Sequence, residues 1–117
     1  MPRFLIIFRS HKDTFDTMAS EQIQHFNQKW QDWWAKGTRE GWLLDASKAL
    51  KTEGRVINAD NTISDGPLVE GADVVRGYMS VRADTLDAAV VLAKDCPVLQ
   101  HGGRVEVRPF FETHPGE

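Results

Sequence analysis

The stretch that decides the fold is DGPLVEGADVVRGYMSVR, from Asp65 to Arg82. From Val74 onward its side chains alternate with a period of two, which predicts a β-strand whose successive residues face opposite sides of a sheet. One side would carry Val75, Gly77, Met79 and Val81, and the other Val74, Arg76, Tyr78 and Ser80. Asp65-Gly66-Pro67 has the composition of a tight turn, so we expect an acidic turn before this strand.

A strand and a helix are predicted before this stretch. Arg3–Arg9 is an apolar run between charged ends, as in a central strand. In Thr17–Lys36 the apolar residues recur at steps of three and four, which gives a helix one apolar face. That face is formed by Ala19, Ile23, Phe26, Trp30 and Trp33. Thr17 or Ser20 is the expected N-cap, and Gly37 is the expected end.

The segment that follows this helix is less regular. Trp42-Leu43-Leu44 has the composition of a strand start, and Ala46–Leu50 is either a short turn or an irregular edge. Gly54–Asn58 predicts a strand, and Asp60-Asn61 predicts the tip of a loop or hairpin.

The last third of the chain predicts a helix and a final strand. Asp84 is the expected cap of the helix, with Asp87 placed as in a capping box. Pro97 would end this helix, whose inward stripe would be Leu86, Ala89, Val90 and Ala93. Gly102-Gly103 then turns the chain into a strand at Arg104–Arg108.

The order strand, helix, strand, strand, helix, strand predicts an α+β fold of the ferredoxin-like βαββαβ type, with one antiparallel sheet and both helices on one face. At 117 residues the chain is expected to form a single domain, 1–117. The second face of such a sheet is bare. A bare apolar face needs a cover, and a second copy of the same sheet is the simplest one, so we expect a homodimer.

Composition narrows the classes of partner. The formal net charge is −3 and the 14 Lys and Arg residues are scattered, which argues against nucleic acid. No apolar run approaches the ~20 residues of a membrane span. The single cysteine, Cys96, excludes an intramolecular disulfide and favours a cytoplasmic location. The four histidines lack the spacing of metal ligands, so we expect neither a metal nor a cofactor.

Several short motifs together resemble the YCII-related family, and its DGPF branch in particular. They are Asp65-Gly66-Pro67 with Glu70, Gly77-Tyr78, Cys96-Pro97, and Gly102–Pro109. The resemblance extends over about Gly54–Phe111, and the order of elements fits the remainder. It implies a dimeric α+β barrel of ferredoxin-like subunits with a small cleft, and no established reaction for most members.

The resemblance also implies candidate catalytic residues. Some relatives in the wider family are linked to ring chemistry on chlorinated hydroxyquinones and use a His–Asp pair. By position, this pair corresponds to His25 in the first helix and Asp95 near the end of the second. In other relatives the domain lies beside sigma-factor modules.

Two interpretations are open for each catalytic candidate. Asp65 is either a turn residue that bonds its own backbone or a carboxylate that faces the cleft as a general base. His25 is either a surface residue or a proton shuttle, since its ordinary pKa lies near neutrality. Asp95 is either an exposed helix-end residue or the group that orients His25.

The ligand-binding candidates are His101, Trp30, Trp34, Tyr78 and Arg108. His101 precedes a glycine turn, where backbone and ligand can approach closely. A tryptophan pair can wall a pocket for a flat ring, although the same area also serves a core or a dimer interface. Arg108 either pairs with Glu106 or holds an anion. Cys96 is interpreted as a packing residue.

Two functions follow from these residues. The first is a cofactor-free acid/base enzyme that acts on a small cyclic or aromatic molecule. The second is a non-catalytic dimeric module that binds a small ligand or serves as a regulatory interaction module. The sequence does not identify the small molecule in either case.

Overall fold

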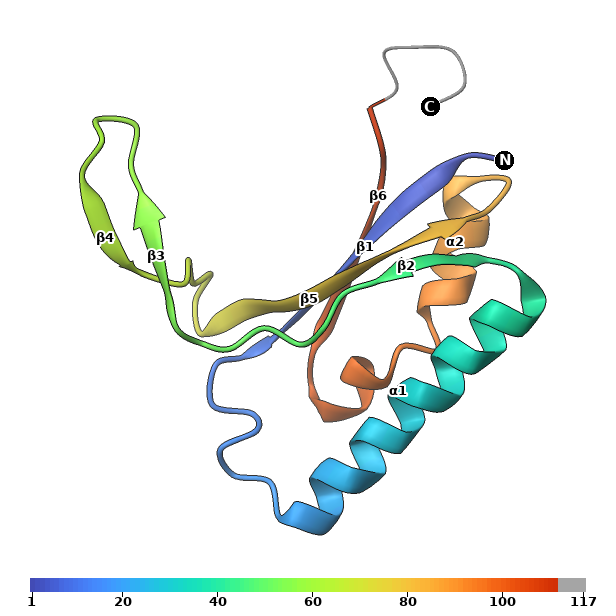
Figure 1. The fold of residues 1–117 in the computed structure, drawn as a ribbon, viewed down its shortest axis with the longest axis horizontal. Helices are drawn as coiled ribbons and strands as arrows, with labels where there is room; N and C mark the ends of the chain where they lie inside the picture. The colour runs from blue at the N-terminus through green and yellow to red at the C-terminus, as the bar shows by residue number, and fades with distance from the viewer. Residues whose placement is uncertain (112–117) are drawn as a thin grey trace.

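A computed structural model describes residues 1–111 of the chain. Within that part, one antiparallel sheet has the strand order β2-β5-β1-β6, and both helices pack on the same face of it (Figure 1). This order confirms the α+β, ferredoxin-like prediction. The elements of this core are β1 (Arg3–His11), α1 (Ser20–Glu40), β2 (Leu43–Ala46), β5 (Asp73–Arg82), α2 (Leu86–Ala93) and β6 (Arg104–Pro109).

A separate hairpin projects from the end of the sheet, away from both helices (Figure 1). It consists of β3 (Gly54–Ile57) and β4 (Ile63–Gly66), which pair with each other and not with the main sheet. The strand predicted at Gly54–Asn58 therefore exists, but β2 supplies the second strand of the ferredoxin-like order. Asp65 lies within β4, opposite Arg55, and not in the turn predicted for it.

Helix α1 extends further than the sequence predicts. Gly37 is a buried residue within the helix. A Cβ at this position would lie 2.8 Å from the ring of Trp42, so a larger residue would not fit. The helix ends instead at Gly41, whose φ of 82° is the left-handed conformation that glycine adopts without steric cost. The predicted end at Gly37 is wrong, since that glycine provides space for the tryptophan ring.

Both predicted N-caps are also wrong. The N-cap of α1 is Ala19, and its free backbone N–H donates to the side chain of Gln22 at 2.9 Å. The N-cap of α2 is Thr85, whose hydroxyl accepts from the backbone N–H of Ala88 at 3.1 Å. Either arrangement satisfies a backbone donor that the first helical turn leaves free.

A β-bulge changes which residues of β5 face the helices. In the register with β1, Phe8 lies opposite Gly77 and Arg9 lies opposite Val75, so Arg76 is the extra residue. Beyond the bulge the alternation shifts by one. Val74 and Arg76 are therefore buried on the same side as Met79, and the faces predicted from strict alternation are wrong for this half of the strand.

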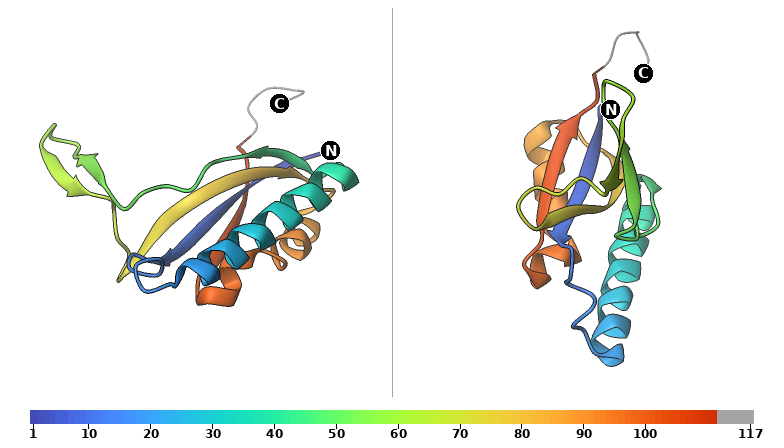
Figure 2. Two further views of the ribbon diagram at one scale, coloured as in Figure 1. Left: turned by 60° about the horizontal axis from the view of Figure 1, so that its bottom comes forward. Right: turned by 90° about the vertical axis from the view of Figure 1, so that its left-hand side faces the viewer.

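The core lies between the sheet and the two helices, as two layers (Figure 2). Its most buried side chains include Ile6 and Met79 from the two central strands. Helix α1 contributes Trp33, and α2 contributes Ala89. The chain beyond α2 continues through a short 3₁₀ helix, η1 (Pro97–His101), which packs near β1 and β6.

The helix-free face of the sheet is only partly apolar. Leu5 and Ile7 of β1 are half-buried there, and Tyr78 is exposed beside them. Arginines surround this strip, namely Arg9, Arg82, Arg104 and Arg108. The face is therefore an apolar strip edged by positive charge, and not the continuous apolar surface from which we expected a dimer.

The length and hydropathy of the helices were compared with those of a membrane span. Neither helix within residues 1–111 combines the length and the apolar character required of a membrane span.

Replacing Gly103 by alanine is expected to lower the free energy of unfolding by about 2 kcal/mol, a usual cost of overpacking. A Cβ at this position would lie 2.7 Å from the carbonyl oxygen of Arg9 and 2.8 Å from that of Val98, so backbone would have to move. Urea unfolding followed by circular dichroism measures the change. Gly54→Ala is the matched control, because the nearest atom to its Cβ would be 3.8 Å away. Equal stability of the two variants would contradict the close approach at Gly103.

Candidate functional site

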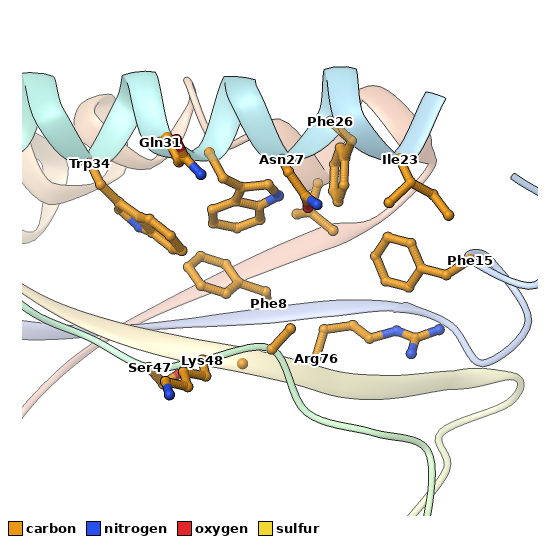
Figure 3. Close-up of a pocket in the computed structure, with 14 residues that line it drawn as sticks. Phe8, Phe15, Ile23, Phe26, Asn27, Gln31, Trp34, Ser47, Lys48 and Arg76 are labelled. Atoms are coloured by element: carbon orange, nitrogen blue, oxygen red, sulfur yellow. The ribbon is translucent and has the colours of Figure 1, made fainter. Parts of the chain in front are cut away.

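A cavity of about 350 Å³ lies between α1, the centre of the sheet and the segment that leaves β2 (Figure 3). Helix α1 lines it with residues spaced three or four positions apart, so that they share one face. These are Ile23, Phe26, Asn27, Trp30, Gln31 and Trp34. The remaining lining residues are Phe8, Phe15, Ser47, Lys48, Ala49, Arg76, Gly77 and Val98.

The wall of the cavity is a connected set of aromatic rings. Phe8 contacts Trp30 edge to face, with ring centroids 4.7 Å apart. Trp30 in turn contacts Trp34 at 5.3 Å and Phe26 at 6.0 Å, and Phe26 contacts Phe15 at 5.5 Å. Each ring is held by at least one other ring, which gives a preorganised apolar surface.

Arg76 provides the one strongly charged group that is largely buried in the wall, since only 9% of the residue is exposed. Its Nε–H donates to Ser10 Oγ at 2.8 Å. Its Nη2 donates to the carbonyl oxygens of His11 and Lys12 at 2.7 and 2.9 Å. The guanidinium carbon lies 4.8 Å from the centre of the Phe15 ring. Figure 3 shows the side chain extending beneath Phe15 at the edge of the cavity.

The positive charge of Arg76 has no direct counterion among residues 1–111. No carboxylate oxygen of that part of the chain makes an ion pair with it within 4.0 Å. Burial lowers the pKa of Arg76, and the more distant carboxylates of Asp16 and Asp13 act in the opposite direction. An arginine keeps its charge in such a site, so a cation without a directly paired carboxylate lies against an apolar cavity.

The opposite side of the cavity is formed by the segment after β2. Ser47 Oγ accepts from the backbone N–H of Tyr78 at 2.9 Å, which fixes the segment against β5. Gly77 lies beneath it, where a Cβ would be 3.2 Å from the same hydroxyl. Lys48 and Ala49 follow and are exposed at the mouth.

Trp34 has an unusual polar feature. Its indole Nε1–H is the only buried side-chain donor within residues 1–111 that has no hydrogen-bond partner. Such unpaired groups are rare in folded proteins and reduce stability. The tryptophan therefore lies in this wall at a cost in hydrogen bonding.

Two of the predicted ligand-binding residues, Trp30 and Trp34, line the cavity. The other three lie elsewhere. Tyr78 and Arg108 belong to the helix-free face. Glu106 pairs with Arg9 at 3.6 Å, so Arg108 does not have the ion-pair partner considered for it.

His101 lies in η1 with its ring edge-on to Phe26, the centroids being 4.5 Å apart. It borders a second, more open hollow of about 530 Å³ beside the loop between β1 and α1. Burial lowers the pKa of His101, and the nearby positive groups Lys29 and His25 lower it further.

The three predicted catalytic residues do not line the cavity. The side chain of Asp65 is 96% exposed in the projecting hairpin, with its Oδ1 3.8 Å from Arg55 Nε. Asp95 pairs with Lys36, at 3.7 Å. Lys36 lies three helical turns beyond His25, roughly 16 Å at the rise of an α-helix. The structure therefore does not bring His25 and Asp95 together, and their catalytic roles stay predictions.

Sequence reasoning missed Arg76, Phe15 and the two amides Asn27 and Gln31. The available signal was an arginine inside an otherwise apolar strand. Under strict alternation Arg76 faces solvent, and only the bulge turns it toward the helices. The two amides lie beside the tryptophans at the cavity edge, although amides on an amphipathic helix usually belong to its polar face (Figure 3).

A metal site is not formed by the residues described. Within 1–111, no three His, Cys, Asp or Glu side chains are grouped closely enough to hold an ion.

The fold and the cavity define a class: a ferredoxin-like α+β domain with an aromatic pocket under its first helix. The family comparison is more specific, because the model of the YCII-related domain matches residues 35–113. The chain therefore belongs to the YCII-related family, as the motifs of the sequence indicated. No curated protein matches the chain significantly.

Cys96 is expected to be inert toward thiol reagents in the folded protein. The residue is 1% exposed, and burial raises the pKa of Cys96 to about 12, so almost no thiolate exists at pH 8. Reaction with Ellman's reagent should release no thiolate chromophore from native protein and one equivalent after unfolding in guanidinium chloride. Rapid labelling of the native protein would contradict the packing role.

Proposed function

We propose that this YCII-related protein binds a small, flat and largely apolar molecule in the cavity beneath α1. The observation that carries the proposal is the ring of mutually supported aromatic side chains around an unfilled volume of about 350 Å³. This volume falls within the usual range for small-molecule pockets, and so does the mainly apolar lining with a few polar groups.

The ring contacts support a planar ligand. Trp30 and Trp34 come from successive turns of α1, and Phe8 rises toward them from β1. A flat molecule between these rings gains stacking and edge-to-face contacts in addition to the burial of its own apolar area. Asn27 and Gln31, at the cavity edge, supply amide donors and acceptors for its polar substituents.

The lining favours binding over acid/base catalysis. Among the described lining residues none is an Asp, a Glu or a His, the usual general acids and bases. The enzyme hypothesis requires Asp65 or His25 to reach the ligand, and neither lies at this cavity. We therefore propose ligand binding as the function of this pocket.

A homodimer is the second part of the proposal. The helix-free face leaves Leu5 and Ile7 partly open to water and Tyr78 exposed. The hairpin also presents Ile57 and Ile63, 71% and 69% exposed, as a cross-strand pair. A two-stranded hairpin is marginally stable alone in water, so a partner that covers it would stabilise it. A second copy that covers both regions accounts for these exposed side chains.

Ala49→Trp is expected to weaken the binding of flat aromatic probes about tenfold or more, because a ring at the mouth occupies the space that the probe needs. Isothermal titration calorimetry with 1-naphthylmethanol and with 1-naphthoate measures the change. Lys51→Trp is the control: it adds the same ring two residues away, at an exposed position that does not line the cavity. The pocket assignment would be refuted if neither probe bound to the wild type, or if the two variants bound the probes equally well.

Ile7→Lys is expected to convert a dimer into a monomer. The new ammonium would lie in the apolar strip of the helix-free face, where burying a charge is costly, and the carboxylate opposite it, Glu106, already pairs with Arg9. Sedimentation velocity at micromolar concentration reports the mass. Val91→Lys, at a 62%-exposed position on α2, should remain dimeric. A wild-type protein that sediments as a monomer under these conditions would reject the dimer.

A further inference from the structure

We propose that the ligand of this pocket is an aromatic carboxylate, and that Arg76 binds its carboxylate through Nη1. The inference rests on the proposed ligand-binding function of the cavity and adds to it the charge and orientation of the ligand. Three features of Arg76 support it: the direction of its side chain, its unused donors and the lack of a directly paired carboxylate.

The direction of Arg76 is set by the β-bulge in β5. Because Gly77 and Val75 pair with consecutive residues of β1, Arg76 has no partner there and its side chain turns to the helix side. Bulges often redirect a side chain next to a functional site. In a regular strand this arginine would lie on the helix-free face, among the other arginines and in contact with water.

The hydrogen bonds of Arg76 leave one nitrogen without a protein acceptor among residues 1–111. A guanidinium has five N–H groups. The Nε–H donates to Ser10, and Nη2 donates to the carbonyl oxygens of His11 and Lys12. These bonds hold the guanidinium in place beneath Phe15 and do not involve Nη1. The two N–H groups of Nη1 are therefore available, on a side chain whose orientation is already fixed.

The charge of Arg76 selects an anion. The guanidinium is largely buried beside aromatic rings, and no carboxylate of residues 1–111 pairs with it. An unpaired charge in such a place is costly, and the attraction of an opposite charge is stronger there than in water. A ligand carboxylate removes the imbalance while its ring occupies the aromatic wall. A carboxylate oxygen accepts a charge-assisted hydrogen bond from Nη1, which is about twice as strong as a bond between neutral groups.

A purely structural role for Arg76 makes a different prediction. Its bonds to Ser10, His11 and Lys12 fasten the loop between β1 and α1, so a structural arginine would affect stability only. It would not distinguish a charged ligand from a neutral one of the same shape. The discrimination between such ligands is therefore the decisive measurement.

The experiment compares 1-naphthoate with 1-naphthylmethanol, which share a ring system and differ in charge, by isothermal titration calorimetry. The wild type is expected to bind the acid about 10- to 100-fold more tightly, the usual effect of a charged hydrogen bond. Arg76→Gln should remove this preference, so that the acid and the alcohol bind with equal affinity. Arg76→Lys should retain part of the preference. Arg82→Gln, which removes an exposed arginine from the same strand, should change neither affinity.

The outcomes separate the two proposals. Equal wild-type affinity for the acid and the alcohol overturns the role of Arg76 and leaves the pocket as a site for neutral rings. A preference for the acid that persists in Arg76→Gln overturns it as well. Binding of neither probe overturns the ligand-binding function itself. If Arg76→Gln does not fold, the wild-type comparison and Arg76→Lys still decide. A preference that falls in Arg76→Lys supports the role of Arg76, and a preference that is undiminished there overturns it.

Discussion

Phe8 lies in the middle of β1 and contacts both Trp30 and Trp33 of α1, with ring centroids 4.7 and 6.4 Å apart. These contacts hold the helix over the sheet, and the rest of the structure depends on them. Trp33 continues into the core through Trp42, at 5.8 Å. Trp30 contacts Trp34 and lines the cavity. One group of aromatic contacts thus closes the core on one side and leaves a lined hollow on the other.

The bulge in β5 adds a charge to this apolar arrangement. A single extra residue reverses the faces of the strand and moves Arg76 from the water side to the helix side. Its bonds to Ser10 and to the following backbone carbonyls hold the β1–α1 loop. The same loop supplies Phe15, which covers the guanidinium. Loop position, ring packing and charge are therefore coupled, and a ligand that changes one of them would affect the others.

The two faces of the sheet serve different purposes in our proposals. The helix side contains the core, where packing excludes water, and beside it the pocket. The helix-free side combines a narrow apolar strip with arginines that are partly paired, such as Arg9 with Glu106 and Arg104 with Asp73. A surface of this kind suits a protein interface better than a solvent-exposed face, because its apolar centre gains from burial while its charged edge stays hydrated.

The sequence by itself determined the order of elements, the apolar face of α1, the final strand after Gly102-Gly103, and the family. These features follow from local periodicity and from short motifs, which need no knowledge of distant contacts. Local rules failed at Gly37, where the ring of Trp42 requires a glycine within the helix, and at Arg76, where the pairing with β1 inserts a bulge. They also could not show that Asp65 lies on a projecting hairpin, or that Asp95 pairs with Lys36 and not with His25. Only the tertiary structure decided the site, because strand register and helix packing determine which distant side chains share a cavity.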